Sequence, residues 1–168
     1  MAKQEIAPEQ LGRSVFEMIG KDWTLIAAKK EGRTNAMTAS WGGLGVLWGR
    51  DCAMIFVRKS RYTKEFLDAS PTFSLNFLDP KTYRSVQNYF GTVSGRDADK
   101  IAVSGLHVEE AEDTPYFAEA GTVLVCRKAG HFDLPESGML PEVQQKWYAE
   151  HDDHTMYVGW IEKVLREV

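Results

Sequence analysis

Residues 35–63 read NAMTASWGGLGVLWGRDCAMIFVRKSRYT, and the rest of the chain is organised around them. A run of small and polar residues ends on Trp41, and Gly42, Gly43 and Gly45 follow, where a backbone without Cβ atoms can approach another group closely. An apolar strand is predicted over 53–57. It leads into RKSRYT, where a helix is predicted to begin.

A strand that runs into a helix N-terminus is a favourable place to hold a phosphate. The first-turn N–H groups have no intrahelical partner, the helix dipole is positive there, and arginine adds bidentate donors. Arg58, Ser60, Arg61 and Thr63 stand at this junction. The stretch therefore predicts a phosphate clamp at one end and, at the other, a wall of small residues with one aromatic. This suits a flat ring that carries a phosphate tail.

Simpler interpretations of both features stay open. Ser60 could only cap a helix over 61–69 while the basic residues are solvated, and the run that ends on Trp41 could be a strand with a core tryptophan. Neither feature decides alone, but together they favour a binding site.

Composition places the chain among single-domain globular proteins. It has 168 residues, of which 43% are apolar and 26% charged, so residues 1–168 are treated as one domain. A net charge of −4 argues against general nucleic-acid binding, which needs a basic face. No apolar stretch is long enough to cross a bilayer, and MAKQEIAPEQLG lacks the apolar core of a signal peptide. We therefore expect no membrane segment and a cytoplasmic location.

Cysteine and histidine give no clear metal pattern. Cys52 and Cys126 lie at or within apolar runs and are predicted to be small core residues. His151 and His154 flank two aspartates and could bind a metal, but H-x-x-H pairs are common by chance. We favour a solvated turn and predict no metal site.

Periodicity predicts mostly strands with short helices between them. Residues 1–12 are expected to be a loose lead-in, and 72–78 a half-buried strand. Thr82 is predicted to cap a second helix that Gly91 ends, Asp97 a third, and residues 130–142 are predicted to form a loop. The other expected elements are strands over 22–29, 116–117, 121–127 and 155–164, and a brief helix near 142–149.

This order lacks regular β-α-β alternation, so a doubly wound parallel sheet is disfavoured. A mainly β (α+β) antiparallel barrel with short peripheral helices is the better prediction. The glycines do not form the G-x-G-x-x-G fingerprint, and the sequence contains neither a G-x-x-x-x-G-K-[ST] loop nor a G-x-S-x-G elbow.

Several motifs in order resemble the flavin reductase-like family with the FMN-binding split barrel, and in particular its flavoredoxin-type branch. The motifs are NAMTASWGGLGVLWG, then RYTKEF, SGRDADK and DHTMYVGWIEKV. The resemblance runs from about Gly20 to Val164, although residues 128–150 contain no motif that we can place. Trp160 stands where the family pattern suggests an acidic residue.

The resemblance implies a six-stranded antiparallel split barrel that works as a homodimer with FMN near the interface. It implies three groups of FMN contacts. Ring and ribityl contacts would come from Met37, Thr38, Ala39, Ser40 and Trp41. Phosphate contacts would come from Arg58, Ser60, Arg61, Tyr62 and Thr63. Ser94, Gly95 and Lys100 would form a second set of contacts that could reach across the dimer, and His154 would close the pocket.

The implied function is an NAD(P)H-dependent FMN oxidoreductase that passes electrons through bound FMN to an acceptor. Hydride transfer to a flavin needs no side-chain base, so no catalytic residue is predicted. One alternative is a flavoredoxin-type electron carrier that a protein partner reduces, without NAD(P)H turnover. Another is a non-enzymatic FMN or haem module, with His151 or His154 as the axial ligand.

Overall fold

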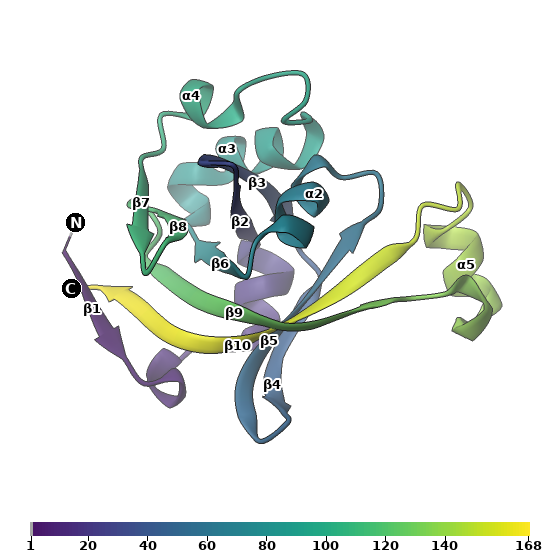
Figure 1. Ribbon diagram of the computed structural model, residues 1–168, viewed down its shortest axis with the longest axis horizontal. Helices are drawn as coiled ribbons and strands as arrows, with labels where there is room; N and C mark the ends of the chain where they lie inside the picture. Colours follow the sequence, from purple (N-terminus) through teal and green to yellow (C-terminus); the bar gives the residue numbers. More distant parts are fainter. Residues whose placement is uncertain (1) are drawn as a thin grey trace.

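The computed structural model describes residues 2–168, and most of its ordered elements are β-strands (Figure 1). The strands are β1 (Lys3–Ile6), β2 (Thr24–Lys30), β3 (Arg33–Ala39), β4 (Gly42–Leu47), β5 (Arg50–Arg58), β6 (Thr72–Phe77), β7 (Val108–Ala111), β8 (Thr114–Phe117), β9 (Thr122–Asp133) and β10 (His154–Glu167). The α-helices are α1 (Val15–Glu17), α2 (Tyr62–Ala69), α3 (Pro80–Thr92), α4 (Lys100–Ser104) and α5 (Pro141–Trp147). Three further short helical segments are η1 (Pro8–Leu11), η2 (Met18–Asp22) and η3 (Glu136–Gly138).

The main sheet has eight strands, and every pairing in it is antiparallel. Its order is β3-β2-β6-β9-β10-β5-β4, with β1 added to the far end of β10. The two ends of this path, β3 and β4, follow each other in the chain and are separated by Ser40 and Trp41. The predicted antiparallel split-barrel class is confirmed, with eight strands in the sheet in place of six.

Two apolar clusters stabilise the sheet from its opposite faces. Alternation along β2 places Ile26 and Ala28 in the barrel cluster, while Leu25 and Ala27 belong to the second cluster, under α3 and β8. Helices α2, α3 and α4 lie on the same side of the long strands in Figure 1, and the two termini lie close together at the left of the view. Cys52 and Cys126 are both free and fully buried, as predicted.

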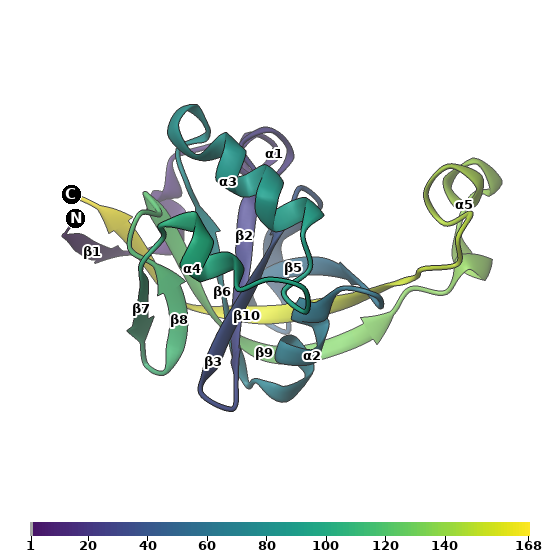
Figure 2. The ribbon, with the colours of Figure 1, turned by 90° about the horizontal axis from the view of Figure 1, so that it is seen from above.

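Beyond Arg127, β9 is no longer paired with β6 and continues with β10 as a long arm, in which β10 also pairs with β5 as far as His154. Pairing reaches Thr155 opposite Asp133, and α5 lies at the end of the arm, away from the other helices in both views (Figure 2). The prediction of a loop over 130–142 is therefore wrong at its start, because β9 runs to Asp133. Partner pairing along β10 overrides the local glycine signal of Gly130.

Several helix caps differ from the predictions. Ser60 does not cap α2: the N-cap residue is Arg61, and the Ser60 hydroxyl donates to Asp152 instead. Asp79 caps α3 by accepting from the Lys81 N–H, and Thr82 donates to the same carboxylate. Pro80 at the first helical position explains why the helix begins earlier than predicted. Helix α3 also passes through Gly91 to Thr92, and α4 is capped by Asp99 rather than Asp97.

Two other local predictions need correction. Residues 3–6 are a strand rather than a loose lead-in, because they pair with the end of β10. Strand β6 is buried on both faces, since β8 covers its polar side. There the Ser74 hydroxyl donates to the Pro115 carbonyl, and the Asn76 side chain donates to the Leu25 carbonyl and accepts from the Phe117 N–H.

Within residues 2–168, no helix is both long and apolar enough to cross a membrane.

Gly159 on β10 tests the packing of the barrel interior. A Cβ atom at this position would lie 2.4 Å from the Phe73 ring and 2.8 Å from the Cys126 Cβ. We expect Gly159→Ala to lower the free energy of unfolding by about 1–3 kcal/mol, because the core must shift to accept it. Gly20→Ala is the control, since a Cβ there meets nothing within 4 Å. Urea denaturation measures both variants, and equal stabilities would contradict the close packing at Gly159.

Candidate anion-binding site

A small cavity of about 90 Å³ joins three segments that are far apart in the sequence. The segments are the start of α2, the loop after α3 and the first residue of α4. The lining residues are Ser60, Arg61, Tyr62, Thr63, Thr92, Val93, Ser94, Gly95 and Lys100. The structure thus brings together, within one chain, most of the predicted phosphate ligands and all of the second predicted set.

Two cations meet at the C-terminal end of α3. The Arg61 guanidinium donates to the Gly91 and Phe90 carbonyl oxygens at 2.7 and 3.2 Å, and the Lys100 ammonium donates to the same Phe90 oxygen at 3.2 Å. Carbonyl groups at a helix C-terminus carry partial negative charge, so they favour both cations. Lys100 is only 3% exposed, which is rare for a lysine.

Burial makes this pair of cations electrostatically unfavourable without an anion. Burial and then the neighbouring charge of Arg61 lower the pKa of Lys100 to about 8. Burial also lowers the pKa of Arg61, although the carboxylate of Asp152 acts in the opposite direction. A phosphate would supply the missing negative charge and accept hydrogen bonds from both side chains and from the first turn of α2.

Gly95 allows the loop after α3 to approach the start of α2. A Cβ atom there would lie 2.3 Å from the Asn35 Oδ1 and 2.9 Å from the Tyr62 ring. Asn35 in turn donates to the Thr63 hydroxyl at 2.9 Å. The beginning and the end of the stretch 35–63 therefore meet beside the cavity.

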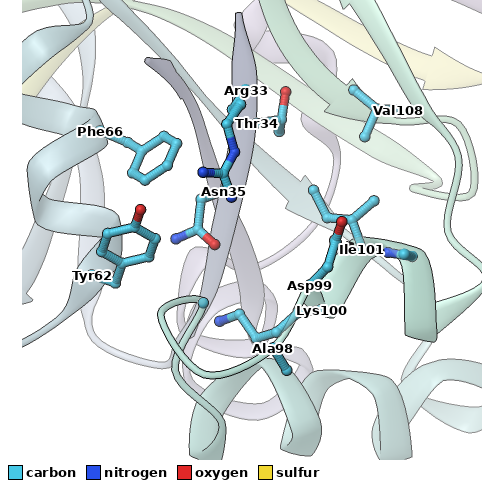
Figure 3. Close-up of a pocket in the computed structure, with 12 residues that line it drawn as sticks. Arg33, Thr34, Asn35, Tyr62, Phe66, Ala98, Asp99, Lys100, Ile101 and Val108 are labelled. Carbon is cyan, nitrogen blue, oxygen red and sulfur yellow. Dashed lines mark hydrogen bonds between the residues drawn. The ribbon is translucent and has the colours of Figure 1, made fainter. Parts of the chain in front are cut away.

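A larger cavity of about 360 Å³ adjoins the anion cavity and shares Tyr62, Gly95 and Lys100 with it. Figure 3 shows the Lys100 side chain directed toward the loop that carries Gly95, with Asn35 and Tyr62 across the space. Phe66, Ile101 and Val108 supply apolar lining, and Arg33 and Asp99 supply charge.

The predicted ring-binding residues differ in their burial and in the groups they contact. Met37 and Ala39 are buried in the barrel cluster, and the Thr38 hydroxyl donates to the Gln87 carbonyl of α3. Thr38 and Ser40 are half-buried, and Trp41 is 39% exposed.

Trp41 contacts two aromatic groups, one at the end of α5 and one at the start of β10. Its ring lies 4.9 Å from that of Trp147 in an edge-on arrangement and 5.2 Å from the His154 imidazole. His154 is buried, and its Nδ1 lies 2.8 Å from the Tyr148 hydroxyl. Burial and then the charge of Arg58 lower the pKa of His154 to about 4, so its imidazole is neutral at neutral pH.

Arg58 is directed toward the arm rather than toward the paired cations. Its guanidinium donates to the Asp152 and Trp147 carbonyl oxygens at 2.8 and 2.9 Å and lies over the Tyr148 ring. Sequence reasoning missed Trp147, Tyr148 and Asp152 as neighbours of the site. The first two lie in the segment without a recognised motif, and their only signal was an aromatic pair in a short helix.

The chain matches the family model described as "Flavin reductase like domain" over residues 18–167. No curated protein matches the sequence significantly. Among solved structures, flavoredoxin from Methanosarcina acetivorans is 26% identical with a TM-score of 0.69, covering 87% of this chain and 68% of that chain.

Two further structures show the same fold at lower identity. Flavoredoxin of Desulfovibrio vulgaris (Miyazaki F) is 21% identical with a TM-score of 0.67, and the match covers 86% of this chain and 69% of that one. The NADH:FAD oxidoreductase of Streptomyces globisporus C-1027 is 19% identical with a TM-score of 0.66, over 96% of this chain and 86% of that one. The family match over residues 18–167, together with the antiparallel split barrel, places this chain in the flavin reductase-like family.

Proposed function

We propose that the protein is an FMN-dependent oxidoreductase that passes electrons from NAD(P)H, through bound FMN, to an acceptor. The observation that carries this proposal is the pair of cations, Arg61 and Lys100, held by one carbonyl oxygen beside the N-terminus of α2. FMN differs from riboflavin by a phosphate, and this donor set fits a phosphate.

Different residues around the cavity would contact the phosphate and the ring of FMN. Arg61, Lys100, the hydroxyls of Thr63 and Ser94, and the first-turn N–H groups of α2 would hold the phosphate. The ring would lie toward Ser40 and Trp41. Because the Met37, Thr38 and Ala39 side chains face the core or α3, these residues would contact the ring through their backbone groups.

When bound, FMN supplies the redox chemistry by accepting a hydride from a nicotinamide. The chain's own residues bind and orient, and no side chain acts as a base. Neutral His154 beside Trp41 presents no competing positive charge at the predicted ring position. The backbone groups of residues 37–40 and the Ser40 hydroxyl would tune the redox potential of the flavin by hydrogen bonding to the ring edge.

A flavoredoxin-type electron carrier is the second candidate. The likeness to the flavoredoxin from Methanosarcina acetivorans, at 26% identity, favours it. In this case a protein partner reduces the bound FMN, and NAD(P)H is not consumed.

The family resemblance also predicts a homodimer with FMN near the interface. An exposed aromatic cluster supports a contact with a second copy. Trp48 and Phe132 are 53% and 46% exposed, and Trp48 lies edge-on to Trp160. Apolar groups of this size are commonly covered in an assembly. The cytoplasmic location also stays a prediction.

The two candidate functions differ in the electron donor. We expect the protein saturated with FMN to bleach near its long-wavelength absorption maximum when NADH or NADPH is added without oxygen. Bleaching with dithionite alone would contradict the enzymatic proposal and favour the carrier. Free FMN with NADH is the control for uncatalysed reduction.

Arg61 should contribute to binding of FMN through the phosphate alone. We expect Arg61→Gln to weaken FMN binding by about 1.5–3 kcal/mol, the typical contribution of a charge-assisted hydrogen bond, and to leave riboflavin binding unchanged. Fluorescence titration measures both affinities. Arg166→Gln, near the chain termini, is the control, and equal losses for both flavins would contradict the phosphate assignment.

Lys100 should make FMN binding depend on pH. Its pKa of about 8 means that it loses its proton as the pH rises through this value in the free protein, while a bound phosphate favours the charged form. FMN affinity should therefore fall by about tenfold between pH 7 and pH 9, since one proton is coupled to binding. Riboflavin affinity should stay flat, and Lys100→Met should remove the FMN dependence. If the FMN affinity of Lys100→Met still depended on pH, the titrating group would be a residue other than Lys100, which would contradict the prediction.

A further inference from the structure

Residues 147–153, which we call the strap, connect α5 to β10 and cover the end of β5. Arg58 donates to the backbone of the strap at Trp147 and Asp152, and the Lys59 N–H donates to the Asp153 carbonyl at 2.9 Å. Ser60 is held by the strap as well. Three consecutive residues that lead into the anion cavity are thus bound to one short segment.

The contact at Ser60 involves the carboxylate of Asp152. One carboxylate oxygen accepts from the Ser60 N–H at 3.1 Å, and the other accepts from its hydroxyl at 2.5 Å. Ser60 also lines the anion cavity, and the charge of Asp152 acts on Arg61. A carboxylate therefore occupies two donors that stand at the edge of the proposed phosphate site.

We propose that Asp152 competes with the flavin phosphate for Ser60, so that phosphate binding detaches Asp152 from Ser60 and loosens the strap there, and the carboxylate limits FMN affinity. This inference rests on the proposed function, because it takes the phosphate of FMN as the competing anion. Two anions close to one hydroxyl repel each other, and only one of them can receive its hydrogen bond. A phosphate also accepts from Arg61 and Lys100, which the Asp152 carboxylate does not reach by a hydrogen bond.

Asp152→Asn tests the competition because it removes the charge and keeps the size of the side chain. We expect this variant to bind FMN about tenfold more tightly than the wild type, as removal of a nearby like charge predicts, and to bind riboflavin with unchanged affinity. Asp153→Asn is the matched control. It removes a carboxylate from the same strap, but one whose side chain lies near Lys59, so its effect on FMN affinity should be smaller.

Hydrogen–deuterium exchange of the whole protein measures directly how firmly the backbone of the strap is held. In the wild type, FMN should increase deuterium uptake over residues 147–153, while riboflavin should not. In Asp152→Asn, uptake there should be raised before any flavin is added. Thermal melting of each variant shows that it is folded.

Three results would overturn the inference. Weaker FMN binding by Asp152→Asn would make Asp152 a positioning residue for Ser60 instead of a competitor. Unchanged FMN binding by this variant, or protection of the strap by FMN in the wild type, would remove the competition and leave the FMN site standing. Failure of the wild type to bind either flavin would overturn the proposed function and the inference together.

Discussion

One carbonyl oxygen, that of Phe90 near the end of α3, accepts hydrogen bonds from both Arg61 and Lys100. Much of the site depends on this shared acceptor, because it holds two like charges next to each other inside the protein. Such a pair is costly when buried and is kept where an anion completes it. The position of α3 against β3, fixed in part by the hydrogen bond from Thr38 to the Gln87 carbonyl, sets where that anion can lie.

A second part of the proposed site lies where the barrel is split. Strands β3 and β4 are the two ends of the sheet, and the chain between them exposes Ser40 and Trp41. Gly42, the first residue of β4, has a backbone φ of +157°, and a Cβ there would meet the Met54 carbonyl at 2.8 Å. The glycine thus lets β4 approach β5 directly after the aromatic residue that the arm contacts.

Sequence reasoning predicted the fold class and most of the residues that line the anion cavity, since both depend on local patterns. Alternation of Phe73, Leu75 and Phe77 indicated a strand, and RKSRYT indicated a helix start with basic donors. It missed features that depend on distant partners. Strand β1 has no apolar alternation and forms because β10 offers an edge, and Ser60 binds a carboxylate 92 residues away in place of capping α2.

The arm was the least predictable part of the chain for the same reason. Residues 128–150 contain no recognised motif, and Gly130, Pro135 and Gly138 indicate a loop. The extension of β9 to Asp133 depends on pairing with β10, and the positions of Trp147 and Tyr148 depend on Arg58. Among the candidate residues, local sequence patterns were enough to predict those near the start of α2. The contacts of Arg58 could be found only from the three-dimensional structure.

A crystal structure of the protein with FMN tests the central claim most directly. The account predicts the phosphate within hydrogen-bond distance of both the Arg61 guanidinium and the Lys100 ammonium, at the N-terminus of α2. A phosphate bound elsewhere, with Arg61 and Lys100 contacting only the carbonyl groups of α3, would contradict it.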